Sequence, residues 1–250
     1  MSAEKPDISG IVNLYKPVGR SSANYVYRLR RIFGVKKVGH AGTLDPFADG
    51  VLLGCVGRAT KLVERIMALS KEYRTTLRLG VTNATYDTEQ PFEPMPGAVE
   101  VSPQRIEAVL GTMIGETQQV PPSFSAVRIG GVPSYKFAKG GRPMPRESRP
   151  VRIERIDILE YSWPRLTLDI RCGRGTYIRA IARDLGKALE CGACCESLTR
   201  RAVGPFRVEE SVDLFSADET RIRASLMPFS QADELIPAST SSPQCRFAAP

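Results

Sequence analysis

Apolar and polar positions along the chain follow two periods, one typical of strands and one typical of helices. Over residues 72–79, Tyr73, Leu77 and Leu79 would share one face with a threonine, and charged or polar residues would share the other. This two-residue alternation predicts a half-buried strand, and it recurs over 166–172. Other apolar segments predict strands over 11–14, 51–56, 151–161, 197–203 and 212–214.

Helical spacing places apolar residues three and four positions apart in four segments. Tyr25, Leu29 and Ile32 form the apolar face of the first, and Gly34 can end it. The mixture of strands and helices lacks a strict βαβ rhythm, which predicts an α/β or α+β domain around a mixed, mostly antiparallel sheet. The predicted helices run over about 22–33, 62–69, 103–113 and 178–189.

Three segments lack a core pattern. Residues 38–49 form a predicted loop rich in glycine and polar residues. Residues 119–150 form a long basic insertion with a hairpin turn expected at Gly130–Gly131, and such a segment is either functional or disordered. Residues 237–250, rich in Ser, Ala and Pro, are expected to be a disordered tail.

The amino-acid composition indicates what kind of partner the protein binds. The 250 residues are enough for one large domain, or for one domain with a small appendage. The 35 Lys+Arg exceed the 27 Asp+Glu, for a net charge of +8, and many of the arginines are clustered. A basic surface attracts polyanions, so nucleic acid is the leading partner. An acidic membrane surface is a weaker alternative, and the excess charge can also serve solubility alone.

The sequence gives no support for a membrane, secreted, metal-binding or cofactor-binding protein. No apolar run approaches the ~20 residues of a membrane span, and the first residues lack the apolar stretch of a signal peptide. We therefore expect a cytoplasmic protein without membrane association. Cys191 and Cys194 form half of a zinc motif with no second pair, and His40 is the only histidine, so no metal is expected. P-loop, dinucleotide and nucleophile-elbow motifs are missing, so no cofactor is expected and the chemistry would use carboxylates, Tyr, Lys and Arg.

Asp45 is the first candidate for that chemistry. It lies in the predicted loop before a buried strand and precedes Pro46, while Gly42 and Gly50 would let a ligand approach closely. A carboxylate at such a strand end suits catalysis. Asp-Pro is also a common turn starter, and the local pattern leaves both interpretations open.

Asp45 lies within the motif Gly39–Pro46 (GHAGTLDP). Five further motifs accompany it along the chain: Gly10–Pro17 (GIVNLYKP), Lys71–Arg74 (KEYR), Gln119–Ala126 (QVPPSFSA), Cys172–Arg179 (CGRGTYIR) and Leu198–Arg201 (LTRR). Together and in this order the six segments resemble the TruB family, the tRNA pseudouridine synthases B, and Gly39–Pro46 is similar to the family signature around its catalytic aspartate. The resemblance extends over about residues 10–210.

The resemblance implies the pseudouridine synthase fold, a mixed and mostly antiparallel sheet with a cleft, and a thumb over about 119–150 that grips RNA. It implies isomerisation of uridine 55 in the T loop of tRNA, in which the N1–C1′ bond breaks and a C5–C1′ bond forms without a cofactor. The catalytic domain would span 1–210 and act as a monomer without an obligatory protein partner. Residues 211–236 would be a short remnant, too short for the additional PUA-type domain of many members. Tyr15 stands where the family commonly has an acidic residue.

The resemblance also assigns roles around Asp45, which would attack the flipped-out uridine. Arg179 would pair with Asp45, although in a helix it could also be a solvated residue. His40 would insert into the T loop and fill the vacated base stack, although a lone histidine can be structural. Asp49 is the rival carboxylate in the same loop.

Three residues would contact the flipped base. Tyr73 would stack on it, Tyr177 would contact the uridine, and Leu198 would pack nearby. By pattern alone each could equally be a core residue. Lys16 could support the structure of its motif or contact a phosphate, and the structural role is preferred. The thumb would clamp the tRNA backbone through its basic residues Arg128, Lys136, Lys139, Arg142, Arg146 and Arg149.

Two other functions remain open at this point. One is an RNA chaperone on the same fold, whose activity would survive the loss of Asp45. The other is a guide-RNA-dependent relative that modifies ribosomal RNA within a larger particle. Activity on bare tRNA separates both from a standalone synthase.

Overall fold

The computed structural model describes residues 8–125, 128–140 and 144–238. Its main sheet contains eleven strands. They are β1 (Gly10–Lys16), β2 (Val38–His40), β3 (Asp49–Val56), β4 (Lys71–Leu79), β7 (Gly115–Gln119), β10 (Arg149–Ser162), β11 (Arg165–Cys172), β12 (Ala193–Val203), β13 (Phe206–Arg207), β14 (Val212–Asp213) and β15 (Leu226–Pro228). Two short ribbons pair β5 (Val81–Thr82) with β6 (Glu93–Pro94) and β8 (Arg128–Ile129) with β9 (Val132–Pro133).

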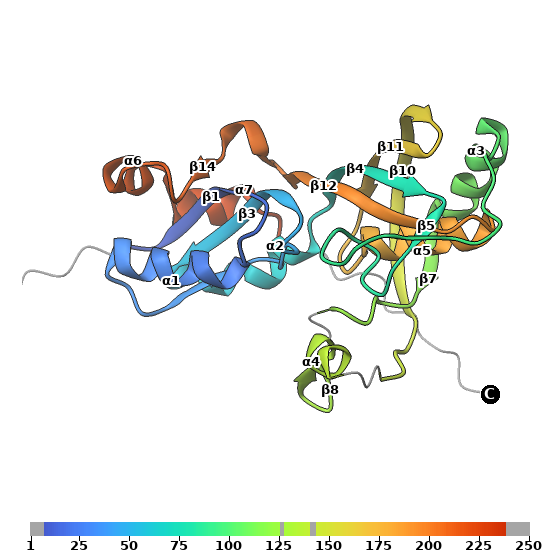
Figure 1. The fold of residues 1–250 in the computed structure, drawn as a ribbon. Helices are drawn as coiled ribbons and strands as arrows, with labels where there is room; N and C mark the ends of the chain where they lie inside the picture. The colour runs from blue at the N-terminus through green and yellow to red at the C-terminus, as the bar shows by residue number, and fades with distance from the viewer. Residues whose placement is uncertain (1–7, 126–127, 141–143, 239–250) are drawn as a thin grey trace, which may run out of the picture.

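The helices flank this sheet (Figure 1). They are α1 (Ser22–Phe33), α2 (Val63–Ala68), α3 (Pro103–Met113), α4 (Ser134–Lys139), α5 (Ile178–Ala188), α6 (Glu219–Ala224) and α7 (Phe229–Leu235), with 3-10 turns η1 (Gly57–Leu62) and η2 (Val208–Glu210). None of the helices within the described ranges is long and apolar enough to cross a membrane.

The main sheet runs β14-β1-β3-β12-β4-β11-β10-β7. Its neighbours are antiparallel except for β1 with β14 and β3 with β12. The β3–β12 pairing consists of only two residue pairs, Thr199 with Asp49 and Arg200 with Gly50. This short parallel junction divides the sheet into the two halves visible in Figure 1. The mixed, mostly antiparallel sheet agrees with the fold class expected from the sequence.

Both faces of the first half are covered, which explains the uninterrupted apolar run of β3. Leu52 and Val56 pack with α1 and α6 on one face. Val51 and Leu53 pack with η1, α2 and α7 on the other. A strand buried on both faces needs no polar alternation. In the second half, α5 and α3 pack with the apolar face of β4 and β11, where Leu77 and Leu168 are fully buried.

Residues 211–236 complete the first half of the sheet. β14 pairs with β1 in parallel, and β15 pairs with the start of β1 in antiparallel fashion. The buried residues of this segment include Leu214, Ile222 and Ile236. This segment therefore packs into the same core as the strands before it. Residues 239–250 of the expected tail lie outside the described residues.

Local pattern misplaced several boundaries. Residues 38–40 form β2, where a loop was expected, because they pair with Gly54–Val56 of β3. The expected helix at 62–69 is a 3-10 turn followed by the shorter α2. β12 begins at Ala193, four residues before its predicted start, and β7, α4, α6, α7 and β15 were not predicted. The turn at Gly130–Gly131 is confirmed, with positive φ at both glycines joining β8 to β9.

Candidate active site

A cavity of about 350 Å³ opens beside the junction of the two halves. Four of the predicted site residues line it, namely Asp45, Tyr73, Tyr177 and Leu198. Arg179 contacts Asp45 from behind the lining, and His40 is not among the lining residues. The remaining wall comes from Gly42–Leu44, Met67, Lys71, Arg149, Gly173–Thr176, Ile178 and Arg200.

The loop that carries Asp45 connects β2 to β3 and is anchored on both sides. The hydroxyl of Ser22, the first residue of α1, donates to the carbonyl of Leu44 at 3.2 Å and accepts from its N–H at 3.1 Å. The N–H of Gly19 donates to the carbonyl of Pro46 at 2.7 Å. The buried ammonium of Lys16 donates to that same carbonyl at 3.4 Å. These bonds hold the residues on either side of Asp45.

Arg200 supports the loop from the sheet. Its buried guanidinium donates to the carbonyls of Val51, Gly42 and Thr43 at 2.8, 3.1 and 3.4 Å. Gly50 has φ +107, and a Cβ there would lie 2.2 Å from the Arg200 carbonyl oxygen. Glycine at this position therefore serves the close approach of β3 to β12, where the sequence had suggested approach by a ligand.

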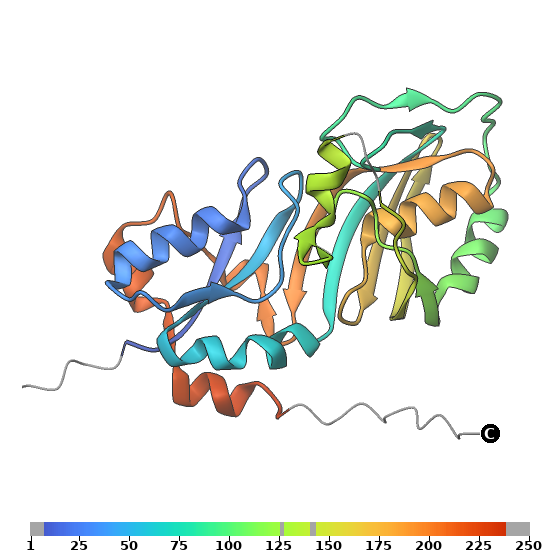
Figure 2. The same cartoon turned by 90° about the horizontal axis from the view of Figure 1, so that it is seen from below.

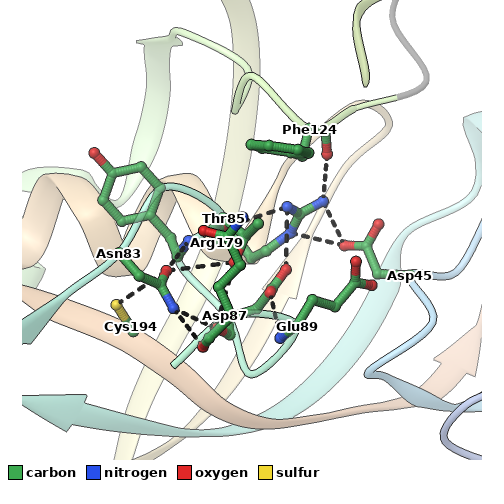
Figure 3. A network of polar contacts seen from close by, with 10 residues as sticks. Asp45, Asn83, Thr85, Asp87, Glu89, Phe124, Arg179 and Cys194 are labelled. Carbon is green, nitrogen blue, oxygen red and sulfur yellow. Dashed lines mark hydrogen bonds and ion pairs between the residues drawn. The ribbon is translucent and has the colours of Figure 1, made fainter. Parts of the chain in front are cut away.

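The carboxylate of Asp45 is bound on one oxygen. Nε and Nη2 of Arg179 lie 2.9 and 2.8 Å from Oδ2 of Asp45. Asp45 is 30% exposed and Arg179 only 3%. Figure 3 shows the second oxygen of Asp45 pointing away from the guanidinium. A buried guanidinium at this distance holds the carboxylate in place by charge-assisted hydrogen bonds.

The rest of the Arg179 guanidinium is satisfied by three further groups (Figure 3). Nη1 donates to the Thr85 carbonyl at 3.1 Å and lies 3.2 Å from Oδ2 of Asp87. Nη2 donates to the carbonyl of Phe124 at 2.9 Å. Arg179 is thus a fixed buried partner of Asp45, and the alternative of a solvated helix residue is excluded by this burial.

Sequence reasoning missed Asp87, which is 1% exposed. Its loop has no hydrophobic period and is held by its own polar contacts. Asn83 accepts from the N–H of Tyr86 at 2.6 Å and donates to the carbonyl of Asp87 at 2.7 Å. Burial raises the pKa of Asp87, although Arg179 acts against this shift. The one signal in the sequence that could have marked Asp87 is that, like Asp45, it is an aspartate in a loop without apolar periodicity.

The two tyrosines reach the cavity from different elements. Tyr73 lies on β4, opposite Arg200 of β12. Tyr177 precedes α5, and the side chain of Gln119 holds its backbone on both sides. The Tyr177 N–H donates to Oε1 of Gln119 at 2.8 Å, and Nε2 of Gln119 donates to the Tyr177 carbonyl at 3.2 Å. Burial raises the pKa of both tyrosines, and the charge of Asp45 adds to the effect for Tyr177. Both hydroxyls are therefore protonated at neutral pH.

Two other candidates lie outside the cavity lining. The hydroxyl of Tyr15 donates to Oδ2 of Asp49 at 3.1 Å. Asp49, the rival carboxylate, is not among the residues that line the cavity. His40 ends β2, and its buried Nδ1 has no hydrogen-bond partner among the described residues. Burial, and then the charge of Arg200, lowers the pKa of His40. The imidazole is therefore neutral at physiological pH.

Two features bear on metal ions. In the described part of the chain, no group of three His, Cys, Asp or Glu side chains is arranged to hold a metal ion. Cys191 and Cys194, the half of a zinc motif seen in the sequence, are buried free thiols. Cys194 lies within β12, where burial raises its pKa to about 12. A thiol with this pKa is a poor source of the thiolate that zinc requires.

Comparison with known proteins decides the family. A family model described as TruB family pseudouridylate synthase (N terminal domain) matches residues 30–178. The chain belongs to the TruB family. The tRNA pseudouridine synthase B of Clostridium novyi is 41% identical to it over 207 residues, which are 83% of this chain and 71% of that protein. The enzyme of the same name from Burkholderia pseudomallei is 39% identical over 211 residues, 84% of this chain and 70% of that protein.

Solved structures confirm the pseudouridine synthase fold of this TruB-family chain. A chain in the crystal structure of a Cbf5-Nop10-Gar1 complex matches with a TM-score of 0.69 at 27% identity, over 90% of this chain and 62% of that one. A chain in the archaeal box H/ACA sRNP Nop10-Cbf5 complex matches with a TM-score of 0.66 at 27% identity, over 92% of this chain and 64% of that one. The chain therefore spans less than two thirds of these structural relatives.

Proposed function

We propose that this TruB-family chain converts uridine 55 in the T loop of tRNA to pseudouridine, with Asp45 as the attacking carboxylate. The observation that carries the proposal is the pairing of a partly exposed Asp45 with a buried Arg179 at the wall of the cavity. The names of the curated relatives support tRNA as the substrate.

The cavity suits a nucleotide taken out of its stack. Its volume of about 350 Å³ lies in the range of small-ligand sites. Enzymes that modify a base flip it into such a pocket and hold it by stacking and edge contacts. In this proposal Tyr73 stacks on the base, Leu198 packs beside it, and Tyr177 contacts the uridine near Asp45.

The chemistry needs one ionised carboxylate and no redox partner. The N1–C1′ bond of uridine breaks, the base turns, and a C5–C1′ bond forms. C5 loses a proton and N1 gains one, so the substrate and product are isomers. The attack can be drawn as addition to the base or through a ribose-derived intermediate, and both routes use Asp45 with its carboxylate held by Arg179.

The segment after β7 extends the proposal to RNA binding. Figure 1 shows α4 and β8 set apart from the body of the sheet, and Figure 2 shows α4 beside the gap between the halves. The described part of this thumb includes Arg146, whose guanidinium donates to the hydroxyl of Ser123. Arg142 lies outside the described residues, and the side chains of Arg128, Lys136 and Lys139 are also not described. Basic residues on such a projection would position the RNA backbone.

The test uses purified protein, an unmodified tRNA transcript and no guide RNA. Pseudouridine is mapped at nucleotide resolution after incubation with the wild type or with Asp45→Asn. We expect one new pseudouridine in the T loop with the wild type and none with the variant, while both bind the transcript. Binding without modification by either protein would replace the proposal with the RNA-chaperone alternative. Modification that requires an added guide RNA would favour the guide-dependent alternative.

A further inference from the structure

Helix α1 presents a cationic face that the candidate active site does not use. Residues 17–44 contain six Lys and Arg and no Asp or Glu. On α1, Asn24, Tyr27, Arg28 and Arg31 are three or four positions apart and therefore share one face. The core face of the helix carries other residues, and the Tyr27 side chain is 75% exposed. A large aromatic side chain in water beside arginines is typical of nucleic-acid binding.

Phe215, from the segment between β14 and α6, extends this face. The guanidinium carbons of Arg20 and Arg28 lie 3.8 and 4.9 Å from the centroid of its ring. The ring is itself fixed by an edge-on contact with Tyr25. Two like charges therefore lie against one aromatic ring. Within the described ranges, no carboxylate forms an ion pair with Arg20, Arg28 or Arg31, so an incoming anion would relieve their repulsion.

The face is also hollowed. Asn24, Tyr27, Arg28, Arg31 and Phe215 line a depression of about 270 Å³. The buried Nε of Arg28 has no hydrogen-bond partner among the described residues. A buried donor without a partner is costly, and an acceptor supplied by a bound molecule would satisfy it.

The position of α1 connects this face to the cavity. The first residue of the helix, Ser22, bonds to Leu44 beside Asp45. Figure 2 shows α1, the loop before it and α4 along the same side of the molecule. With twelve residues, α1 is about 18 Å long. A polyanion held at the cavity can therefore continue along α1.

We propose that this face is a second RNA-binding surface, on which arginines contact phosphates and an unpaired base stacks on Tyr27. That the RNA is the substrate tRNA rests on the function proposed above. Charge complementarity selects RNA as the occupant, because the face combines an exposed aromatic ring with guanidinium groups that form no ion pair with a carboxylate of the described residues. The α1 surface consists of Arg20, Asn24, Tyr27, Arg28, Arg31 and Phe215.

The test measures equilibrium binding of an unmodified tRNA transcript at several salt concentrations, together with the single-turnover rate at saturating RNA. The test variant is Tyr27→Ala with Arg31→Ala, two exposed positions. The matched control is Arg105→Ala, which removes an exposed arginine from α3 in the other half. We expect the Kd of the double variant to rise about tenfold, the loss of one stacked base or more. The slope of log K against log salt should become shallower by about 0.7 for the lost phosphate contact.

The turnover rate at saturation should not change, because neither residue lines the cavity. Tyr27→Phe with Arg31 intact should bind like the wild type, since the ring is retained. A Kd and salt slope equal to those of the Arg105→Ala control would overturn the proposal. The binding measurement needs no turnover, so failure of the wild type to form pseudouridine would contradict the proposed function without deciding the α1 surface.

Discussion

Nη1 of Arg179 lies 3.2 Å from Oδ2 of Asp87, and both side chains are almost completely buried. The same guanidinium holds Asp45 through Nε and Nη2. Arg179 therefore lies between two carboxylates, Asp45 at the cavity and Asp87 in the interior. A buried ion pair contributes little net stability, because desolvation offsets the attraction. The value of this arrangement is orientation, since the guanidinium cannot turn away from Asp45 without leaving Asp87 unpaired.

The Asp87→Asn variant tests this orientation. We expect kcat to fall about 10- to 100-fold, or roughly 1.4–2.7 kcal/mol of transition-state stabilisation, while the Kd for tRNA is unchanged. Asparagine keeps the shape but removes the charge that faces Nη1. Single-turnover rates and binding isotherms give the two quantities. A fall in affinity with an unchanged rate would show that Asp87 acts on RNA binding instead.

The same variant carries a pH signature. Burial raises the pKa of Asp87, so the wild-type residue takes up a proton at a higher pH than an ordinary aspartate. Its charge is present above that pKa and is lost as the pH falls through it. The wild-type rate should therefore decline on acidification, and this limb should be absent from the already slow Asp87→Asn variant. Parallel profiles in the two proteins would assign the limb to another group.

Gln119 should position Tyr177. Gln119→Ala removes both hydrogen bonds to a half-buried backbone and should lower the free energy of unfolding by about 1–3 kcal/mol. Gln119→Glu can still accept from the Tyr177 N–H but cannot donate to its carbonyl. We expect the rate to fall in the order wild type, Glu, Ala, measured at saturating RNA. Equal rates in all three proteins, with lowered stability, would limit Gln119 to a structural role.

Ser22 should hold the Asp45 loop. Ser22→Ala loses both bonds to Leu44, which should lower stability by about 1–3 kcal/mol and reduce the rate through the displacement of Asp45. The matched control is Ser21→Ala, because Ser21 is the N-cap residue of α1 yet makes no side-chain cap hydrogen bond. Urea unfolding and single-turnover rates compare the two. An equal effect at both positions would point to helix capping as the cause.

Lys71 should make stability depend on alkaline pH. Burial lowers its pKa to about 8 from the usual 10.5, while its ammonium donates to the carbonyls of Met67 and Leu69. Between these values the unfolded chain holds a proton that the folded chain has released, so this group makes stability rise with pH above 8. From pH 7 to 9.5, the stability of the wild type relative to Lys71→Met should increase by about 2 kcal/mol in urea unfolding. The exposed Lys61→Met control should show no such change, and a flat difference for Lys71→Met would contradict the assignment.

Much of the local structure could be predicted from period alone. The spacing of Tyr25, Leu29 and Ile32 placed α1, and the alternation around Leu77 placed β4, because each helix or strand buries one face of its own. The bounds of α2 could not be predicted in this way, because the apolar residues of the expected helix 62–69 are divided between a 3-10 turn and one short helix. The C-terminal helices α6 and α7 were missed because each has few apolar residues, which bury against distant segments such as α1 and β1.

The candidate site divides in the same way. The motifs resembling the TruB family contain Asp45, Tyr73, Tyr177 and Leu198, and the structure brings all four to one cavity. Gln119 begins one of these motifs and Asp87 lies in an unpatterned loop, but neither position indicated what the residue does, because each acts through a partner far along the chain. Arg179 is 92 residues from Asp87, and Tyr177 is 58 from Gln119.

By itself the sequence determined the residue types, the local periods and, through its motifs, the family. Only the tertiary structure decided which groups meet: that Arg179 bridges two carboxylates, that Arg200 supports the Asp45 loop, and that Phe215 contacts both Arg20 and Arg28. The physical reason is that the apolar periodicity of a segment shows which of its faces is buried, but not which other segment packs against that face. Partners follow from the simultaneous packing of strands and helices from all parts of the chain, in which buried polar groups must find one another.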